Sequence, residues 1–461
     1  MRSLFVIALA ALAACTHHEA GEKSPRNGVE LGPWLLDPQP TSMTVAWTTP
    51  LKTVGSVSYG QAGALDKKAS EAEATVDHRV VITGLTPGDK FEYRIDGEVP
   101  VGGSFTTAPP AEGDLLDKPF RVLIYGDNRT NGGDHALVVR AAGSEHAVLA
   151  LHTGDMVVDA KQPKAWATWF AVERDLLAHT PIVPTVGNHE ITDHGVTYSR
   201  HFKDAGRPTF RALQYGTLHV LVLDSFEQAA GAEPHHGAVS DAQRAWAEAE
   251  AKSIPKDHQL WVLVHQGPFA HPVSKRPGHG GSEAVKALIH AVDQIHHVAA
   301  TFAGHEHFYE RGVEEGLTWF VLGGGGAPLD EPDATFPSVQ RAAKALSYMV
   351  VDVCGCHAIG RAKDITGKTF DEFVLGDCPQ ACTAPTSAFQ PIAQSAADAG
   401  TADAGAAGDA GAPAGGAVLP DGGAAIVPLV PAASTTSEAT PAAPAPRPPP
   451  RDAPSAPAQA K

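Results

Sequence analysis

The chain is poor in basic residues. It contains 35 lysines and arginines against 52 aspartates and glutamates, which gives a formal net charge of −17 at pH 7. A surface that binds nucleic acid needs a cluster of basic side chains to attract phosphate groups. The balance therefore argues against nucleic acid as a partner, and it favours solubility without indicating any other partner.

Long apolar runs are also scarce. The run from Leu4 to Ala14 is too short to cross a bilayer as a stable helix, and no later run is long enough. It follows Arg2 and ends in Leu12-Ala13-Ala14-Cys15, which is typical of a secretory signal and similar to a bacterial lipobox. We expect residues 1–15 to form a lipoprotein-type signal peptide. A plain signal peptide cut at a small residue is the alternative.

This leader predicts where the protein works. A chain with such a signal is exported, and one acylated terminus tethers an otherwise soluble protein to a membrane face. We therefore expect a lipid-anchored protein of the bacterial cell envelope, either periplasmic or at the cell surface. Its contact with the membrane would be the lipidated Cys15.

Cysteine is rare, with five in 461 residues. Apart from Cys15 they are Cys354, Cys356, Cys378 and Cys382. In an exported chain disulfide bonds are their natural use, and three pairings are possible. Cys354–Cys378 with Cys356–Cys382 is a guess that the sequence does not decide. A thiolate zinc site is the alternative, which an oxidising compartment disfavours.

Aromatic residues almost vanish beyond Cys382. Alanine, proline, glycine and serine dominate residues 383–461. Such a segment cannot bury enough apolar surface to offset the entropy lost on ordering. We expect a disordered tail that acts as a flexible spacer and takes no part in catalysis.

Residues 29–108 read as an all-β domain. Short alternating stretches such as Met43–Trp47 and Phe91–Ile95 are separated by turn residues. This pattern predicts a β-sandwich. Leu85-Thr86-Pro87-Gly88 resembles a turn of fibronectin type III domains, although the tyrosine common at that corner is Phe91 here. The stretch Thr106–Pro110 is the expected linker.

A second domain, residues 119–382, mixes apolar strand-like runs with helical patterns. Helical spacing is clearest in Ala165–Leu177, and Ala242–Ala251 and Ser282–Val292 also favour helix. Five polar motifs each follow an apolar run directly, at the point where α/β folds place their ligands. The motifs are Gly126-Asp127-Asn128-Arg129, His152-Thr153-Gly154-Asp155, Gly187-Asn188-His189-Glu190, His265 and Gly304-His305-Glu306-His307.

These motifs supply the donors of a metal centre. Two aspartates, one asparagine and three histidines offer oxygen and imidazole ligands for two divalent or trivalent ions. Two ions roughly 3.5–4 Å apart form a clamp for in-line attack on a phosphoryl group. Any one of these residues alone could be a hydrogen-bonded core or turn residue, and only the ordered set carries the prediction.

The order of the motifs resembles that of the calcineurin-like metallophosphoesterases. Gly304-His305-Glu306-His307-Phe308-Tyr309-Glu310-Arg311 is most similar to the purple acid phosphatase branch, and the likeness runs from about Val29 to about Leu375. The resemblance implies an α/β sandwich of two mixed sheets flanked by helices. It also implies an N-terminal domain like that of plant-type purple acid phosphatases, and hydrolysis of phosphate esters with two iron, manganese or zinc ions.

The resemblance also assigns roles to residues. Asp155 would bridge the two metals, Asp127 and His307 would bind the first, and Asn188, His265 and His305 would bind the second. A hydroxide between the metals would attack phosphorus. His189 would contact phosphate or protonate the leaving oxygen, and His271 is a further candidate for binding substrate.

Two positions depart from the family pattern. Val158 stands where purple acid phosphatases have an iron-binding tyrosine, and Arg129 stands where other metallophosphoesterases supply a histidine. The first metal would then lack a usual ligand, which water, His135 or His152 could replace. The protein would also lack a purple colour. The Arg129 guanidinium suits a phosphate oxygen, with a salt bridge to a local carboxylate as the alternative.

Three functions follow. The first is an acid phosphatase-like phosphomonoesterase, or else a phosphodiesterase, in the cell envelope. The second is a phosphatase-like lipoprotein in which a degenerate metal site serves only for binding. The third makes the β-domain an adhesion module and the larger domain its cargo.

Overall fold

The computed structural model describes residues 28–61, 63–97, 101–112, 119–203, 208–227, 237–274 and 279–376. The expected signal peptide with Cys15 and the expected tail lie outside these ranges. Cys378 and Cys382 lie outside them too, so the disulfide pairing stays a prediction. No helix among the described residues is both long and apolar enough to cross a membrane.

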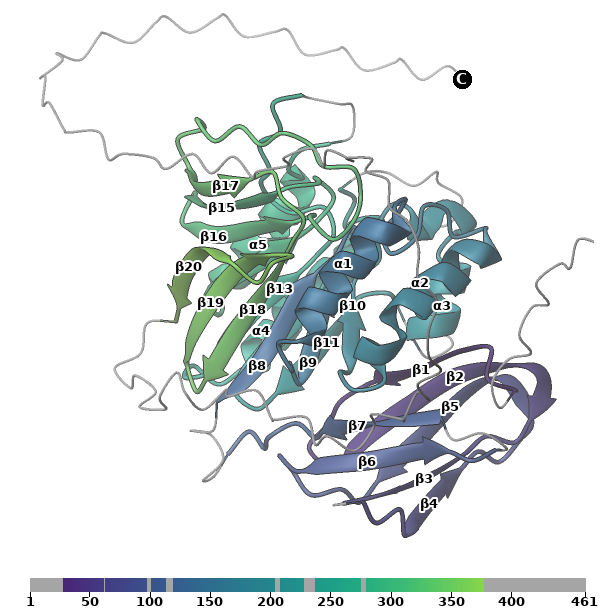
Figure 1. Ribbon diagram of the computed structural model, residues 1–461. Helices are drawn as coiled ribbons and strands as arrows, with labels where there is room; N and C mark the ends of the chain where they lie inside the picture. Colours follow the sequence, from purple (N-terminus) through teal and green to yellow (C-terminus); the bar gives the residue numbers. More distant parts are fainter. Residues whose placement is uncertain are drawn as a thin grey trace, which may run out of the picture. The chain divides into compact units, whose positions relative to one another are not determined.

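The N-terminal part is built of two antiparallel sheets that share one core (Figure 1). Trp47 packs in that core, stacked on His78 with ring centroids 4.6 Å apart. Phe91 is buried there as well, where an apolar ring needs no hydroxyl partner. The predicted all-β class is therefore confirmed. The sheets are β1 (Leu31–Leu36), β2 (Ser42–Thr53) and β5 (Thr75–Thr83), and β4 (Lys67–Ser70), β3 (Ser56–Gly60), β6 (Lys90–Ile95) and β7 (Val101–Thr106).

The larger part contains two mixed sheets. The first has the order β10-β9-β8-β18-β19-β20 and the second β11-β12-β13-β14-β16-β15-β17. The first comprises β8 (Phe120–Tyr125), β9 (Leu149–His152), β10 (Ile182–Pro184), β18 (Ser347–Cys354), β19 (His357–Asp364) and β20 (Thr369–Leu375). The second comprises β11 (Arg211–Tyr215), β12 (Leu218–Val222), β13 (Gln259–Leu263), β14 (Val298–Ala303), β15 (Tyr309–Glu314), β16 (Leu317–Leu322) and β17 (Val339–Ala343).

Three of the helices in the described residues lie near the expected positions. The helices are α1 (Gly132–Gly143), α2 (Pro163–Leu177), α3 (Val196–Phe202), α4 (Asp241–Ser253) and α5 (Glu283–Asp293), with a 3₁₀ turn η2 (Glu190–Asp193). The three helical stretches expected from spacing correspond to α2, α4 and α5. The predicted sandwich of two mixed sheets with flanking helices is confirmed.

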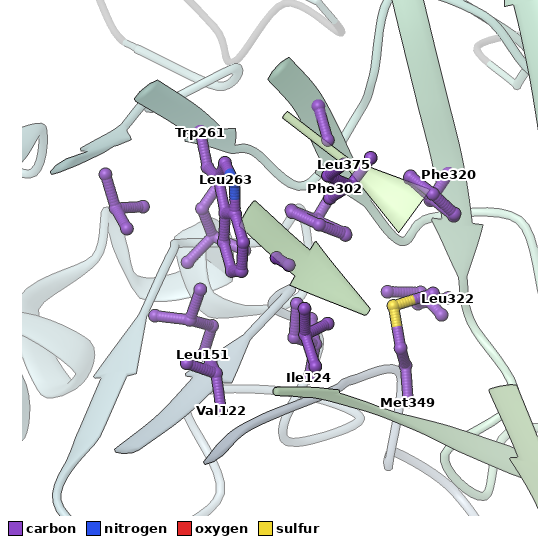
Figure 2. Close-up of a cluster of buried hydrophobic side chains, with 14 of the residues drawn as sticks. Val122, Ile124, Leu151, Trp261, Leu263, Phe302, Phe320, Leu322, Met349 and Leu375 are labelled. Atoms are coloured by element: carbon purple, nitrogen blue, oxygen red, sulfur yellow. The ribbon is translucent and has the colours of Figure 1, made fainter. Parts of the chain in front are cut away.

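The core explains why the strands are nearly continuous apolar runs. In β8, Val122 and Ile124 belong to the layer between the two sheets, where Figure 2 shows them with Trp261 and Phe302 of the second sheet. The alternate residue Leu123 belongs instead to the cluster that contains the helical side chains of α1 and α2. Successive side chains of a strand point to opposite faces, so a strand covered on both faces must be apolar throughout.

The strand directions bring the motif loops together. β8, β9 and β10 are parallel neighbours in the first sheet, and β12, β13, β14 and β16 are parallel neighbours in the second. The carboxyl ends of parallel neighbours meet at one edge of a sheet. The two edges adjoin, because the His265 Nδ1 atom after β13 lies 2.6 Å from the Thr153 carbonyl oxygen after β9.

An aromatic cluster joins β1 to the larger domain. The Trp34 ring lies 4.5 Å from the Phe170 ring of α2, and its indole N–H donates to the His201 carbonyl oxygen at 3.2 Å. The His201 imidazole is buried among these rings and that of Trp166. Burial, together with the Arg200 charge, lowers the pKa of His201 to about 4.

We expect this cluster to lose stability in acid. With a pKa near 6.5 in the unfolded chain, His201 takes up its proton on unfolding between about pH 6.5 and pH 4, so folding is disfavoured as the pH falls through that window. Between pH 7.5 and pH 4.5, the unfolding free energy of the wild type should fall by about 2–3 kcal/mol more than that of a His201→Phe variant. Urea unfolding at the two pH values measures this difference. Equal losses in both proteins would refute this, and exposed His297→Phe is the control.

Candidate metal centre

Three of the expected ligand residues lie in strained backbone. Asp127, Asp155 and His305 have φ angles of 57°, 56° and 73°, in the left-handed region that non-glycine residues avoid. Such strain persists only where the surroundings hold it in place. Here the two Asp127 carboxylate oxygens accept the His305 N–H at 3.1 and 3.2 Å. At Gly304 an added Cβ would lie 2.2 Å from the Asp127 carboxylate, so only glycine permits this approach.

Four expected ligands of one metal converge, and we call them the second donor set: Asp155, Asn188, His265 and His305. The Asn188 Oδ1 atom lies 3.1 Å from both His265 Nε2 and His305 Nδ1. The His265 Nε2 atom is also 3.3 Å from Asp155 Oδ1. Because His265 Nδ1 is hydrogen-bonded to the Thr153 carbonyl oxygen, its Nε2 atom must face the cluster.

The charges in this set are strongly coupled. Burial alone would lower the pKa of His265, but the Asp155 carboxylate outweighs it and raises that pKa to about 9. Burial would raise the pKa of Asp155, yet His265, His189 and Arg129 together hold it well below its usual value. The buried carboxylate therefore demands a positive charge at this point, which a proton on His265 or a metal ion can supply.

Three expected ligands of the other metal also meet, and we call them the first donor set: Asp127, Asp155 and His307. Their ligand atoms all lie within 4.8 Å of one another. His307 Nδ1 donates to the Pro328 carbonyl oxygen at 2.9 Å, which turns Nε2 toward the carboxylates, 3.8 Å from Asp127 Oδ1. Burial and the Arg129 charge lower the pKa of His307 to about 4, while burial raises that of Asp127 well above normal.

Arg129 reaches into this first donor set. Its Nε donates to Asp155 Oδ2 at 3.0 Å, and its Nη2 donates to His307 Nε2, also at 3.0 Å. The alternative expectation for this residue, a salt bridge to a nearby carboxylate, is what the structure shows, and that carboxylate is a member of both donor sets. Its expected contact with substrate phosphate stays a prediction.

His189 stands beside the cluster with its ring oriented. Its Nδ1 donates to the Val158 carbonyl oxygen at 2.6 Å, so Nε2 faces Asp155 Oδ2 at 3.8 Å. Its backbone N–H donates to Asp155 Oδ1 at 3.1 Å. The side chain is partly exposed, so Nε2 can meet both a ligand and water.

The comparisons with known proteins agree with this geometry. The model of the purple acid phosphatase N-terminal domain matches residues 33–107, and that of the calcineurin-like phosphoesterases matches residues 120–309. Residues 120–309 thus belong to the calcineurin-like phosphoesterase family. Membership supports metal-dependent hydrolysis of phosphate esters, and the family fold implies two divalent metal ions.

The named relatives of this phosphoesterase domain include two purple acid phosphatases. Purple acid phosphatase 21 of Arabidopsis thaliana is 24% identical over 294 residues, which cover 58% of this chain and 63% of that protein. The match therefore spans less than two thirds of the relative's length. The purple acid phosphatase PPD1 from yellow lupin (Lupinus luteus) seeds has a TM-score of 0.62 at 15% identity, covering 77% of each chain. PhoD has a TM-score of 0.59 at 13% identity, covering 75% of this chain and 92% of its own.

The two residues offered as substitute ligands in this phosphoesterase have other partners. His135 Nε2 lies 2.7 Å from Glu173 Oε1, whose carboxylate also accepts the Tyr125 hydroxyl at 2.9 Å. His152 is buried and hydrogen-bonded to the Asn128 side chain. Both therefore have structural hydrogen-bond partners within the described residues.

The structure places His279, and not the expected His271, against a member of the second donor set. His271 lies 3.4 Å from carboxylate oxygens of Glu310 and Glu314 and stacks on Phe336, and its expected role in substrate binding stays untested. The His279 ring instead stacks on the His305 ring, with centroids 4.7 Å apart and planes within 14°. No sequence signal distinguished His279 from other histidines between the motifs, such as His194 and His201.

Glu190 is a positioning residue that sequence reasoning missed. Its buried carboxylate accepts the backbone N–H groups of Asp155, Met156, Val157 and Gly187 at 2.8–3.3 Å. It thereby fixes the loop that carries Asp155 to the loop that carries Asn188. Burial and the Asp155 charge raise its pKa to about 7. Its place beside Asn188 and His189 in one motif was the available signal.

We expect Glu190→Gln to destabilise the protein. An amide NH₂ would face backbone donors that now bond a carboxylate oxygen, and each buried N–H left without an acceptor costs about 1–3 kcal/mol. Urea unfolding should show a loss of about 2–4 kcal/mol. Exposed Glu73→Gln, the matched control, should change stability by less than about 0.5 kcal/mol. A Glu190→Gln protein as stable as that control would contradict the bracing role.

Proposed function

We propose that this protein is a metal-dependent phosphatase that hydrolyses phosphate esters of the monoester class, with diesters as the alternative substrates. The observation that supports this most is the second donor set, in which side chains from four loops meet at the adjoining edges of two sheets. The Asp155, His265 and His305 donors lie within 3.1–3.3 Å of a neighbouring member of the set. A partly exposed His189 lies beside this set, where hydrolysis would need a proton donor.

The second donor set fits a metal ion. It offers a carboxylate, an amide oxygen and two imidazoles, which suit iron, manganese or zinc. His265 is oriented by its bond to the Thr153 carbonyl oxygen, as a ligating imidazole is in known centres. An ion held there would polarise a phosphoryl oxygen and lower the pKa of water.

His189 and Arg129 supply the remaining chemistry. The His189 Nε2 atom lies at the partly exposed edge of the cluster, where it can give a proton to the leaving alcohol oxygen. The Arg129 guanidinium uses two of its five N–H groups on Asp155 and His307. The others can bind a phosphate oxygen of the substrate and hold phosphorus in line for attack.

We further propose that the reaction takes place in a cell envelope. The support is the sequence alone, through the apolar leader and Cys15. Labelling of the expressed full chain with a fatty-acid probe, compared with Cys15→Ser, tests this part independently of the enzymatic activity.

The proposal is tested by an assay of metal-loaded protein on phenyl phosphate and bis(p-nitrophenyl) phosphate. Turnover of the monoester should be lost with a chelator and restored by metal. Asp155→Asn should lower turnover at least about 100-fold while the circular dichroism spectrum stays native. Losing a hydrogen-bond partner of a metal ligand already costs about 10–100-fold, and losing the ligand itself should cost at least as much. Exposed Asp257→Asn should leave turnover unchanged. Chelator-resistant turnover, or full activity in Asp155→Asn, would rule the proposal out.

The role of His189 predicts a dependence on the leaving group. With His189→Gln, kcat on phenyl phosphate should fall about 100-fold, within the range for a lost general acid. The fall on p-nitrophenyl phosphate should be under about tenfold, because nitrophenolate leaves without a proton. Equal losses on the two substrates would instead mean that His189 only binds phosphate. Exposed His297→Gln is the control.

A further inference from the structure

The first donor set has a constraint at His307. In a neutral imidazole one nitrogen carries a proton and the other has a single lone pair. His307 Nδ1 donates to the Pro328 carbonyl oxygen, so the lone pair is on Nε2. The Arg129 Nη2 atom lies 3.0 Å from that Nε2 and points an N–H at it. A metal would need the same lone pair at about 2.0–2.1 Å, so the guanidinium and a metal exclude each other at this atom.

The guanidinium also occupies the carboxylate side of the first donor set. Arg129 Nε donates to Asp155 Oδ2 at 3.0 Å, and the side chain is 16% exposed. A guanidinium cannot lose its charge in a protein, and its planar shape spans two acceptors at once. It therefore places a permanent positive charge between Asp155 and His307, where the family fold implies the first metal.

The backbone around Arg129 holds the side chain in this place. The Arg129 N–H donates to the Asp155 carbonyl oxygen at 3.2 Å, and the Arg129 carbonyl accepts the Asn131 N–H at 3.1 Å. The Asn131 side chain in turn caps α1 through the N–H groups of Gly133 and Asp134. The arginine is thus anchored to the Asp155 loop on one side and to a helix on the other. Val158 stands where the family has an iron-binding tyrosine, and its side chain has no donor atom that could help a metal displace the guanidinium.

We propose that the Arg129 guanidinium takes the place of the first metal ion, so that the chain binds one metal, at Asp155, Asn188, His265 and His305. This deepens the proposed function and rests on it only in assuming that the second donor set binds metal. The first donor set does not fit an ion while Arg129 stays bound to Asp155 and His307. The substrate phosphate would then be held by one metal and one guanidinium.

Metal stoichiometry tests this directly. The full chain is loaded with Mn²⁺, excess ion is removed by gel filtration, and bound manganese is measured by elemental analysis and electron paramagnetic resonance. The wild type should hold one equivalent with the spectrum of isolated ions. Arg129→His replaces the guanidinium by an imidazole lone pair and should hold two equivalents with the spectrum of an exchange-coupled pair. Arg140→His, at an exposed position of α1, should stay at one.

The outcomes separate this inference from the proposed function. Two coupled equivalents in the wild type would overturn the inference even if phosphate esters are hydrolysed, and so would a folded Arg129→His protein that holds only one. No bound manganese in the wild type would overturn it as well. One equivalent in the wild type without any hydrolysis would support the inference and end the proposed function. If Arg129→His does not fold, the wild-type stoichiometry alone decides.

Discussion

Two carboxylates buried side by side constrain the rest of this structure. Asp127 is 0% and Asp155 1% exposed, and like charges out of water repel strongly unless positive groups offset them. Arg129 and His265 contact Asp155, while backbone N–H groups of His305 and His189 bond the two carboxylates. These groups come from loops of both sheets, and no single loop carries all of them.

The fold provides this convergence by ordinary means. Parallel strands bring their carboxyl ends to one edge, and strands apolar on both faces fix the two sheets across a shared core. Gly304 then allows close approach to Asp127, and Glu190 joins two loops through backbone N–H groups. Strain at the ligand residues is thus balanced by bonds within the same site.

The sequence predicted the fold class and the residues that meet, because both depend on local patterns. Apolar runs predict the strands β8 and β13, and the motifs that follow them contain the predicted ligands Asp127 and His265. The sequence could not predict which residue each of these side chains contacts. The placement of Arg129 on His307 and the stacking of His279 on His305 depend on loops far apart along the chain. Glu190 stands in one motif with Asn188 and His189, but its role was missed because its partners are backbone N–H groups.

The most direct test is a crystal structure of manganese-loaded protein with anomalous-difference density at the manganese edge. The account predicts one peak, within about 2.0–2.3 Å of ligand atoms of Asn188, His265, His305 and Asp155. Arg129 should still contact Asp155 and His307 in the same crystal. A peak between Asp127 and His307 with the Arg129 side chain turned away would contradict the assignment of that position to the guanidinium. The absence of any peak among these residues would contradict the metal centre itself.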